Sequence, residues 1–386
     1  MILFLAIALS VYGLVNFYVA RRGFQALAAA PRARTVFLVL FVLLALAFPV
    51  GRLLLSGVRG RFATALAEAG MFHMAVMLYA VLAVLAVDIV RLANAFVPFL
   101  PRAWSAAGSR AGLGVFAVAA GAVALVLAYG AWNATRLRTV DLDLRLAAGS
   151  GTFERLTLVA ASDLHLGALV GPRRLAKVVA RMNALAPDAV LFAGDIVDES
   201  VTEAIEARLG GIMKGLRAPL GVYACPGNHE FYSGLERNLA CLRSCGVTVL
   251  QDEAVVVGGA FRLVGRRDPS SLGRGEVRLS IPGILGQIGP AATDLPVVVL
   301  DHQPLRLDEA AAAGAALQIS GHTHDGQLFP IDVINGFIYE LNWGYRRKGE
   351  THFYVTSGAG TWGPPVRVGS RAEIVRIRVT FERPAD

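Results

Sequence analysis

The chain changes character near residue 134, from long apolar runs to short apolar runs separated by polar segments. Four runs before that point are long enough to cross a bilayer, which takes about 20 apolar residues. They cover residues 2–20, 35–55, 71–90 and 111–132. Charged side chains are almost absent from them, so the pattern predicts an α-helical transmembrane region of about four spans within residues 1–133.

After residue 134 the pattern becomes that of a water-soluble α/β domain. Residues 140–146 alternate apolar and charged side chains, as a half-buried strand does. Short apolar runs typical of buried strands then alternate with helical segments. The expected strands are 155–162, 189–193, 221–224, 297–300, 317–320 and 353–356, and the expected helices are 172–186, 202–216 and 235–244. Residues 254–265 and 372–381 predict additional strands of a mixed sheet.

Composition supports this division of the chain. The protein is 55% hydrophobic and 17% charged, which is too apolar for an entirely soluble protein. Residues 1–133 hold ten Arg, no Lys and two acidic residues, so the whole net charge of +8 lies there. A nucleic-acid-binding protein would carry its basic excess on a folded domain, so nucleic acid is not favoured as a partner. We expect an anchor over 1–133, a linker and first strand over 134–154, and a catalytic domain over 155–386.

The arginines between the spans predict their orientation. Seven lie in the first and third loops: Arg21, Arg22, Arg32, Arg34, Arg91, Arg102 and Arg110. Only three follow the second span: Arg52, Arg59 and Arg61. Because cytoplasmic loops are enriched in Arg and Lys, this asymmetry predicts a multi-pass cell-membrane protein with an extracytoplasmic domain. Membrane lipids would contact the N-terminal helices. His73, at the start of a span, is expected to be an interfacial polar residue.

Polar side chains follow the apolar strands of the second region, where each strand should end. The clusters contain Asp163 and His165; Asp195 and Asp198; Asn228, His229 and Glu230; Asp301 and His302; and His322 and His324. Ligand sites gather at the carboxyl ends of strands in open α/β sheets. A ligand set of histidine nitrogens, carboxylate oxygens and an amide oxygen, without Cys, suits Mn, Fe or Zn. The number of ligands is large for one ion, so the sequence predicts two ions that share a carboxylate.

In order along the chain, these residues resemble the motifs of the calcineurin-like metallophosphoesterase family. The motifs are SDLHLG at 162–167, GDIVD at 194–198, GNHE at 227–230, DHQP at 301–304 and GHTHDGQ at 321–327. The resemblance covers about 138–380, and GAGTWGPPVR at 358–367 resembles the closing loop of bacterial membrane-associated members. Asp325 stands where many such members have Gly, which leaves the shape and charge of the pocket floor open.

The resemblance implies a four-layer α/β/β/α sandwich and two divalent metal ions. One ion would be held by Asp163, His165, Asp195 and His324, and the other by Asp195, Asn228, His302 and His322, with Asp195 as the bridge. In this pattern His229 is not a ligand; it would protonate the leaving group or stabilise the transition state. Asp198 would orient His229, or alternatively cap a helix.

These observations predict a membrane-anchored, dinuclear metal-dependent phosphoesterase. Its substrate would be a phosphomonoester, phosphodiester or pyrophosphate, either a phosphorylated small molecule or a lipid-linked envelope compound. The alternative is a non-catalytic membrane protein whose domain only binds metal or a partner; such a protein would have lost a ligand or His229, and neither is lost. Four arginines could contact a phosphate-rich substrate or form a solvated basic surface: Arg266, Arg267, Arg274 and Arg278.

Overall fold

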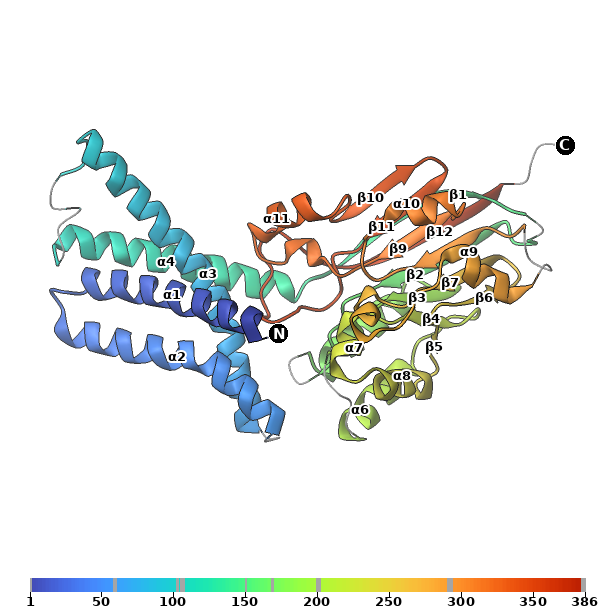
Figure 1. Ribbon diagram of the computed structural model, residues 1–386, viewed down its shortest axis with the longest axis horizontal. Coiled ribbons are helices and arrows are strands. Elements are labelled where there is room, and N and C mark those ends of the chain that lie inside the picture. The colour runs from blue at the N-terminus through green and yellow to red at the C-terminus, as the bar shows by residue number, and fades with distance from the viewer. Residues whose placement is uncertain are drawn as a thin grey trace. The chain divides into compact units, whose positions relative to one another are not determined.

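In the computed structural model the chain forms two compact units (Figure 1). The helical unit contains Met1–Trp132 with Gly363–Val366, and the sheet unit contains Asn133–Trp362 with Arg367–Asp386. The described residues are 2–57, 61–101, 104, 108–149, 151–167, 170–198, 203–289 and 294–382. Arg59 and Arg102 of the predicted loops lie outside these ranges, as do the side chains of Arg52, Arg61 and Arg274.

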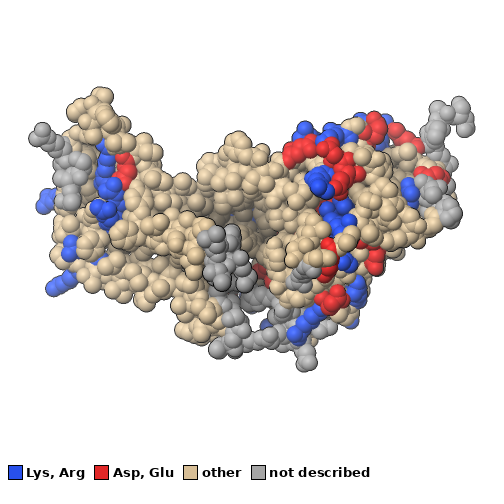
Figure 2. Space-filling view, viewed as in Figure 1, with Lys and Arg blue, Asp and Glu red and all other residues tan. Residues whose placement is uncertain are grey.

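The helical unit contains four long helices. They are α1 (Ile2–Ala26), α2 (Pro31–Gly57), α3 (Arg61–Phe96) and α4 (Arg110–Ala134). Among the described residues, three segments are long and apolar enough to span a membrane: Pro31–Gly51, Phe62–Phe96 and Arg110–Ala134. The first predicted span lies in α1, so the expectation of about four spans is approximate. In Figure 2, charged side chains are sparse over these helices and dense over the sheet unit on the face drawn.

The interior of the helical unit holds one polar group that differs from the prediction. His73 is 1% exposed, and its Nε2 donates to Oδ1 of Asn16 at 2.8 Å. Asn16 in turn donates to the backbone oxygen of Tyr12 at 2.9 Å. The expectation of an interfacial His73 is therefore wrong, because α3 begins twelve residues earlier at Arg61 and carries His73 into the bundle. A polar side chain buried there needs a hydrogen-bond partner, and α1 supplies it.

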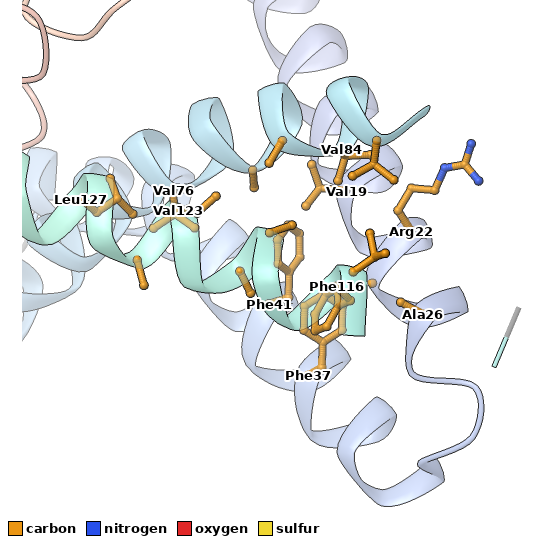
Figure 3. A pocket seen from close by; sticks show the side chains of 18 of the residues that line it. Val19, Arg22, Ala26, Phe37, Phe41, Val76, Val84, Phe116, Val123 and Leu127 are labelled. Atoms are coloured by element: carbon orange, nitrogen blue, oxygen red, sulfur yellow. The ribbon is translucent and has the colours of Figure 1, made fainter. Parts of the chain in front are cut away.

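A cavity of about 550 Å³ lies among the four helices and is lined mainly by apolar side chains (Figure 3). Its charged lining residues are Arg22, Asp88 and Arg91. Asp88 pairs with Arg22 at 2.6 Å and with Arg91 at 3.3 Å, and it accepts the hydroxyl of Tyr18 at 2.5 Å. The carboxylate of Asp88 is thus neutralised by neighbours from α1 and α3.

The sheet unit contains two six-stranded sheets. In sheet order, the first is β1 (Leu137–Ala147), β12 (Ala372–Glu382), β2 (Arg155–Ala161), β3 (Ala189–Ala193), β4 (Val222–Cys225) and β5 (Thr248–Val249). The second is β10 (Gly344–Lys348), β11 (Thr351–Val355), β9 (Leu317–Ser320), β8 (Val297–Leu300), β7 (Phe261–Gly265) and β6 (Glu253–Val257). Strands β2 to β5 are mutually parallel, as are β7, β8, β9 and β11.

The layers follow from which faces are apolar. Side chains of both sheets, such as Leu191 of β3 and Leu300 of β8, share one buried core, so the sheets pack face to face. Helices α5 (Pro172–Asn183), α6 (Glu203–Met213) and α8 (Leu235–Ser244) cover the other face of the first sheet. Helices α9 (Ile281–Leu285) and α10 (Leu307–Ala312) cover the second. The architecture is the expected α/β/β/α sandwich.

Two details of the topology go beyond the sequence pattern. The strands expected at 254–265 and 372–381 do join mixed sheets, but different ones: β6 and β7 lie in the second sheet, and β12 lies inside the first, antiparallel to β2. The pattern did not predict β10 or the short helices α7 (Asn228–Ser233) and α11 (Ile331–Ile338). Periodicity identifies a strand but does not identify its partner.

Candidate metal centre

The strand ends of both sheets deliver the predicted ligands to one place. Asp163 and His165 follow β2, Asp195 follows β3, and Asn228 begins α7 after β4. From the second sheet, His302 follows β8, while His322 and His324 follow β9. Among the described residues, three groups have ligand atoms within 4.8 Å of one another: Asp163, His165 and His324; His165, Asp195 and His229; and Asp195, His302 and His322.

The first group combines two histidines with one carboxylate. Nε2 of His165 lies 3.0 Å from Nε2 of His324, which lies 3.4 Å from Oδ1 of Asp163. All three side chains are buried. Two imidazole nitrogens and a carboxylate oxygen converging in this way fit a divalent cation of the Mn, Fe or Zn type.

The third group, Asp195, His302 and His322, lies around the amide of Asn228. Nε2 of His302 lies 3.1 Å from Oδ2 of Asp195 and 3.1 Å from Oδ1 of Asn228. Nδ1 of His322 lies 2.9 Å from the same amide oxygen. Nδ1 of His302 faces the carbonyl oxygen of Ala193 at 2.8 Å, and a carbonyl can only accept, so Nδ1 carries the proton and Nε2 is left to bind a cation. Asp195 belongs to two of the three groups, which is the position a bridging carboxylate requires.

Five of the seven predicted ligands have a left-handed backbone. Their φ angles are 52° at Asp163, 49° at His165, 51° at Asp195, 72° at His322 and 53° at His324. Such a conformation costs a non-glycine residue of order 1–3 kcal/mol and gathers at functional sites. The loops therefore hold these side chains in place against a local preference for other conformations.

Glycine allows one ligand loop to approach another. A Cβ atom at Gly227 would lie 2.2 Å from Oδ1 of Asp195, far inside van der Waals contact. Only glycine lets the GNHE segment come this close to Asp195. That approach also allows the backbone N–H of His229 to donate to Oδ1 of Asp195 at 2.9 Å.

The electrostatics of the cluster favour a cation. Burial would raise the pKa of Asp195, but the nearby His302 outweighs it and holds that pKa well below its usual range. Burial would lower the pKa of His302, yet the charge and hydrogen bond of Asp195 raise it well above the ordinary value, so a cation bound at Nε2 would replace the proton that this nitrogen otherwise shares with Asp195. Burial lowers the pKa of His322 to about 3 and that of His324 well below its ordinary value. Both rings are therefore uncharged at neutral pH and have a nitrogen lone pair that can bind a metal ion.

Asp198 contacts two histidines. Its Oδ1 pairs with Nδ1 of His229 and lies 3.4 Å from Nδ1 of His165. The contact with His229 is the one expected from the sequence; the contact with His165 is an addition. Burial would lower the pKa of His229, but the hydrogen bond to Asp198 and the charge of Asp195 raise it. His229 is thereby suited to carry a proton near neutral pH.

Glu230 has a role that the sequence reasoning missed. Its buried carboxylate accepts four backbone N–H groups: Asp195 at 3.1 Å, Ile196 at 2.7 Å, Val197 at 2.9 Å and Gly227 at 2.8 Å. It therefore joins the GDIVD loop to the GNHE loop. The available signal was a glutamate at the third position of a helix that starts after Gly227, which is the capping-box pattern.

Arg367 is a second missed residue. Its fully buried guanidinium donates to the backbone oxygens of Ser357 at 2.7 Å, Gly360 at 2.8 Å and Arg371 at 2.9 Å. It ties together the segment whose sequence resembles a closing loop. No local pattern distinguishes this arginine from an exposed one.

Three of the four arginines considered for substrate contact have described side chains, and these three form ion pairs. Arg266 is buried and pairs with Asp301 at 3.2 Å and with Glu309 at 2.7 Å, while Arg278 pairs with Asp301 at 2.5 Å. For these two, a phosphate contact and a solvated surface are both wrong, because the buried carboxylate of Asp301 requires neutralisation. Arg267 pairs with Glu276 at 2.6 Å.

Asp325 has a left-handed backbone, which an aspartate rarely adopts. Its φ and ψ are 51° and 43°, the left-handed region that glycine adopts without strain. Its Oδ1 accepts from Nδ2 of Asn342 at 3.3 Å. Burial and the charge of Asp332 raise the pKa of Asp325 to about 7.

Comparison with known proteins identifies the family. The family model described as calcineurin-like phosphoesterase matches residues 156–326, which include every predicted ligand. A protein of Aquifex aeolicus named as an uncharacterized metallophosphoesterase is 32% identical over 226 residues, covering 58% of this chain and 85% of that protein. The chain belongs to the calcineurin-like phosphoesterase family.

Two further relatives are longer than the matched region. A Danio rerio transmembrane protein with metallophosphoesterase domain is 32% identical over 267 residues, which cover 66% of this chain. A Helicobacter pylori protein named as an uncharacterized metallophosphoesterase is 32% identical over 231 residues, which cover 58%. In each case the match covers 60% of the relative's own length, so this chain spans about three fifths of these relatives. The family and the His/Asp cluster together fit a dinuclear divalent metal site.

Proposed function

We propose that this protein is a membrane-anchored phosphoesterase that uses two divalent metal ions to hydrolyse a phosphoester or pyrophosphate bond. The observation that carries the proposal is the convergence of six His and Asp side chains and the amide of Asn228 from both sheets, with His229 and Asp198 beside them. Residues 1–133 would form the anchor, 134–154 the linker with the first strand, and 155–386 the catalytic domain. The domain would lie outside the cytoplasm, as the arginine asymmetry indicates.

The side chains would divide the metals between them as the family pattern implies. Asp163, His165, Asp195 and His324 would hold one ion, and Asp195, Asn228, His302 and His322 would hold the other. When bound, such a pair activates water, orients the phosphate and neutralises its charge. The neutral rings of His322 and His324 and the ionised Asp195 are in the protonation states that binding requires.

His229 would complete the reaction on the leaving-group side. Hydrolysis adds a water oxygen to phosphorus, breaks one P–O bond and transfers a proton to the departing oxygen. The pKa of His229 is raised by the hydrogen bond to Asp198, so the ring can carry that proton at neutral pH. Asp198 is a positioning residue, because it also contacts His165 and so fixes the distance between the proton donor and the metal ligands.

A lipid-linked or envelope phosphoester is the substrate class that an anchored enzyme favours. Helices embedded in a bilayer keep the domain in the same surface as such substrates and raise the frequency of encounter. The zebrafish relative, whose name combines a transmembrane protein with a metallophosphoesterase domain, is consistent with this organisation.

The test uses the full chain purified in detergent, stripped with a chelator and loaded with Mn²⁺ or Zn²⁺. We expect metal-dependent release of nitrophenolate from 4-nitrophenyl phosphate or from bis(4-nitrophenyl) phosphate, with two ions per chain by metal analysis. Asp195→Asn is the matched variant and should lose both activity and metal. A fully loaded wild-type chain that cleaves neither compound nor extracted membrane lipids would favour the alternative, a domain that only binds metal or a partner.

A further inference from the structure

The metal centre is bordered by an exposed apolar surface, which we call the rim. It consists of side chains from α7, from α11 and its flanks, and from the segment before residue 363: Tyr232, Phe329, Val333, Ile334, Phe337, Ile338 and Trp362. Among the described residues of the sheet unit, these are seven of twelve large hydrophobic side chains that are exposed. Exposed apolar residues are normal when scattered, but a concentration beside a site marks an interaction surface.

Ring contacts and hydrogen bonds connect the rim to the centre. The ring centroids of Tyr232 and Trp362 lie 5.8 Å and 6.2 Å from that of His229. Nδ2 of Asn335, on α11, donates to the backbone oxygen of Thr323 at 3.1 Å, between the ligands His322 and His324. The rim is therefore attached to the elements that carry the proton donor and two ligands.

Helix α11 has the reverse of the usual amphipathic arrangement. A surface helix of a soluble protein turns its apolar side chains inward and its polar ones outward. In α11, Asn335 and Asp332 are half-buried against the protein, while Val333, Ile334 and Phe337 face outward. Phe337 is 88% exposed. Water alone would not favour this orientation, so an apolar partner must cover the helix in the working protein.

The chain itself indicates what that partner is. Helix α4, which is long and apolar enough to span a membrane, ends at Ala134, and β1 begins at Leu137. The chain from Ala134 to Leu137 reaches at most about 11 Å, so β1 begins close to the bilayer surface. Trp and Tyr side chains are typical of the membrane–water interface, and a helix with one apolar face can lie in that plane. Residues 327–339 contain no Lys or Arg, so attraction to anionic headgroups is not the driving force.

We propose that the rim inserts into the bilayer surface and binds the hydrocarbon chain of an amphiphilic phosphoester while the phosphate reaches the metal centre. This proposal rests on the proposed function and specifies its substrate class. The rim would recognise the hydrocarbon chain of the substrate, and the metal centre would recognise its phosphate. An experiment can therefore separate what each contributes to substrate recognition.

The experiment compares substrates that share a scissile bond and differ only in chain length. For a phosphodiesterase the pair is methyl and hexadecyl 4-nitrophenyl phosphate; for a phosphomonoesterase it is ethyl and hexadecyl phosphate with phosphate release as readout. The full chain is reconstituted in phosphatidylcholine vesicles that also carry the long-chain substrate. Phe337→Ser is the test variant, since so exposed a side chain can be removed without loss of packing. Val277→Ser is the control, because Val277 is 76% exposed in the sheet unit outside the rim.

We expect Phe337→Ser to lower kcat/KM for the hexadecyl substrate about tenfold and to change that for the short substrate less than twofold. Phe337→Leu should retain most of the activity, and Val277→Ser should alter neither substrate. Equal losses for both substrates would overturn the proposal and make α11 a support for the centre. No loss for either substrate would also overturn it, and would leave the rim to a protein partner. A wild-type chain inactive on both substrates would instead defeat the proposed hydrolysis of phosphoesters, which is a failure distinct from that of the rim.

Discussion

Replacing Glu230 with Gln removes one negative charge and almost no volume, at the residue that joins the two central ligand loops. Oε1 accepts from the backbone N–H groups of Ile196 and Val197, and Oε2 accepts from those of Asp195 and Gly227. A glutamine has only one oxygen. In either rotamer its NH₂ group therefore faces two backbone donors that it cannot satisfy.

The cost can be worked out from this count. Each buried donor left without an acceptor costs about 1–3 kcal/mol, so two donors give a loss of about 2–6 kcal/mol in the free energy of unfolding. For a domain of this size, 1 kcal/mol shifts the melting temperature by about 2–4 °C. We expect Glu230→Gln to lower the melting temperature of the sheet unit by about 4–24 °C. Metal affinity should fall as well, because the same amides set the positions of Asp195 and, through Gly227, of Asn228.

The assay is thermal unfolding of the full chain in detergent after treatment with a chelator, followed by tryptophan fluorescence. Trp343 and Trp362 lie in the sheet unit and report on its unfolding. Glu236→Gln is the matched control, since Glu236 is exposed on α8 and the chemical change is the same. Titration with Mn²⁺ then measures the loss of metal affinity. A melting temperature for Glu230→Gln within 2 °C of both the wild type and the control would refute the reasoning.

Four further predictions concern chemistry and topology. Asp195→Asn should abolish hydrolysis and the loading of both ions together, and two ions per chain in that variant would disprove the bridge. His229→Ala should keep both ions but lose about 10²- to 10⁴-fold in kcat, with a smaller loss for the good leaving group nitrophenolate; loss of metal would make His229 a ligand instead, as its grouping with His165 and Asp195 allows. Asp198→Asn should give a weaker form of the same pattern. A reporter fused after residue 386 should be active only outside the cytoplasm, and cytoplasmic activity would reverse the orientation.

The elements of the sheet unit were predictable wherever a local pattern is strong. Buried strands such as β3, β8 and β9 appear in the sequence as apolar runs with the same bounds that the structure gives them. Helix α5 was also predictable, since its buried residues recur at helical spacing after a proline in the first turn. Helix α11 was missed because its eight residues are too few to establish a helical period, and β10 was missed because its sequence, GYRRK, is not an apolar run.

The ligand residues were predictable for a different reason. Metal ligation requires particular side chains, and His, Asp and Asn stand out when they follow apolar strands. The residues that support the ligands do not stand out. Glu230 and Arg367 act through backbone groups of other loops, for which the capping-box position of Glu230 gives only a local signal and Arg367 gives none. Arg266 acts through Asp301, 35 residues away.

The sequence by itself therefore determined the chemistry of this protein: the apolar spans, the strand and helix pattern, and the identity of the side chains at the strand ends. Only the tertiary structure decided how the strands divide between two sheets, that His73 meets Asn16 inside the helical unit, and that α11 turns its apolar face away from the protein. The physical reason is that periodicity reports which face of an element is apolar. What covers that face depends on segments far away in the chain, and for α11 on a partner outside it.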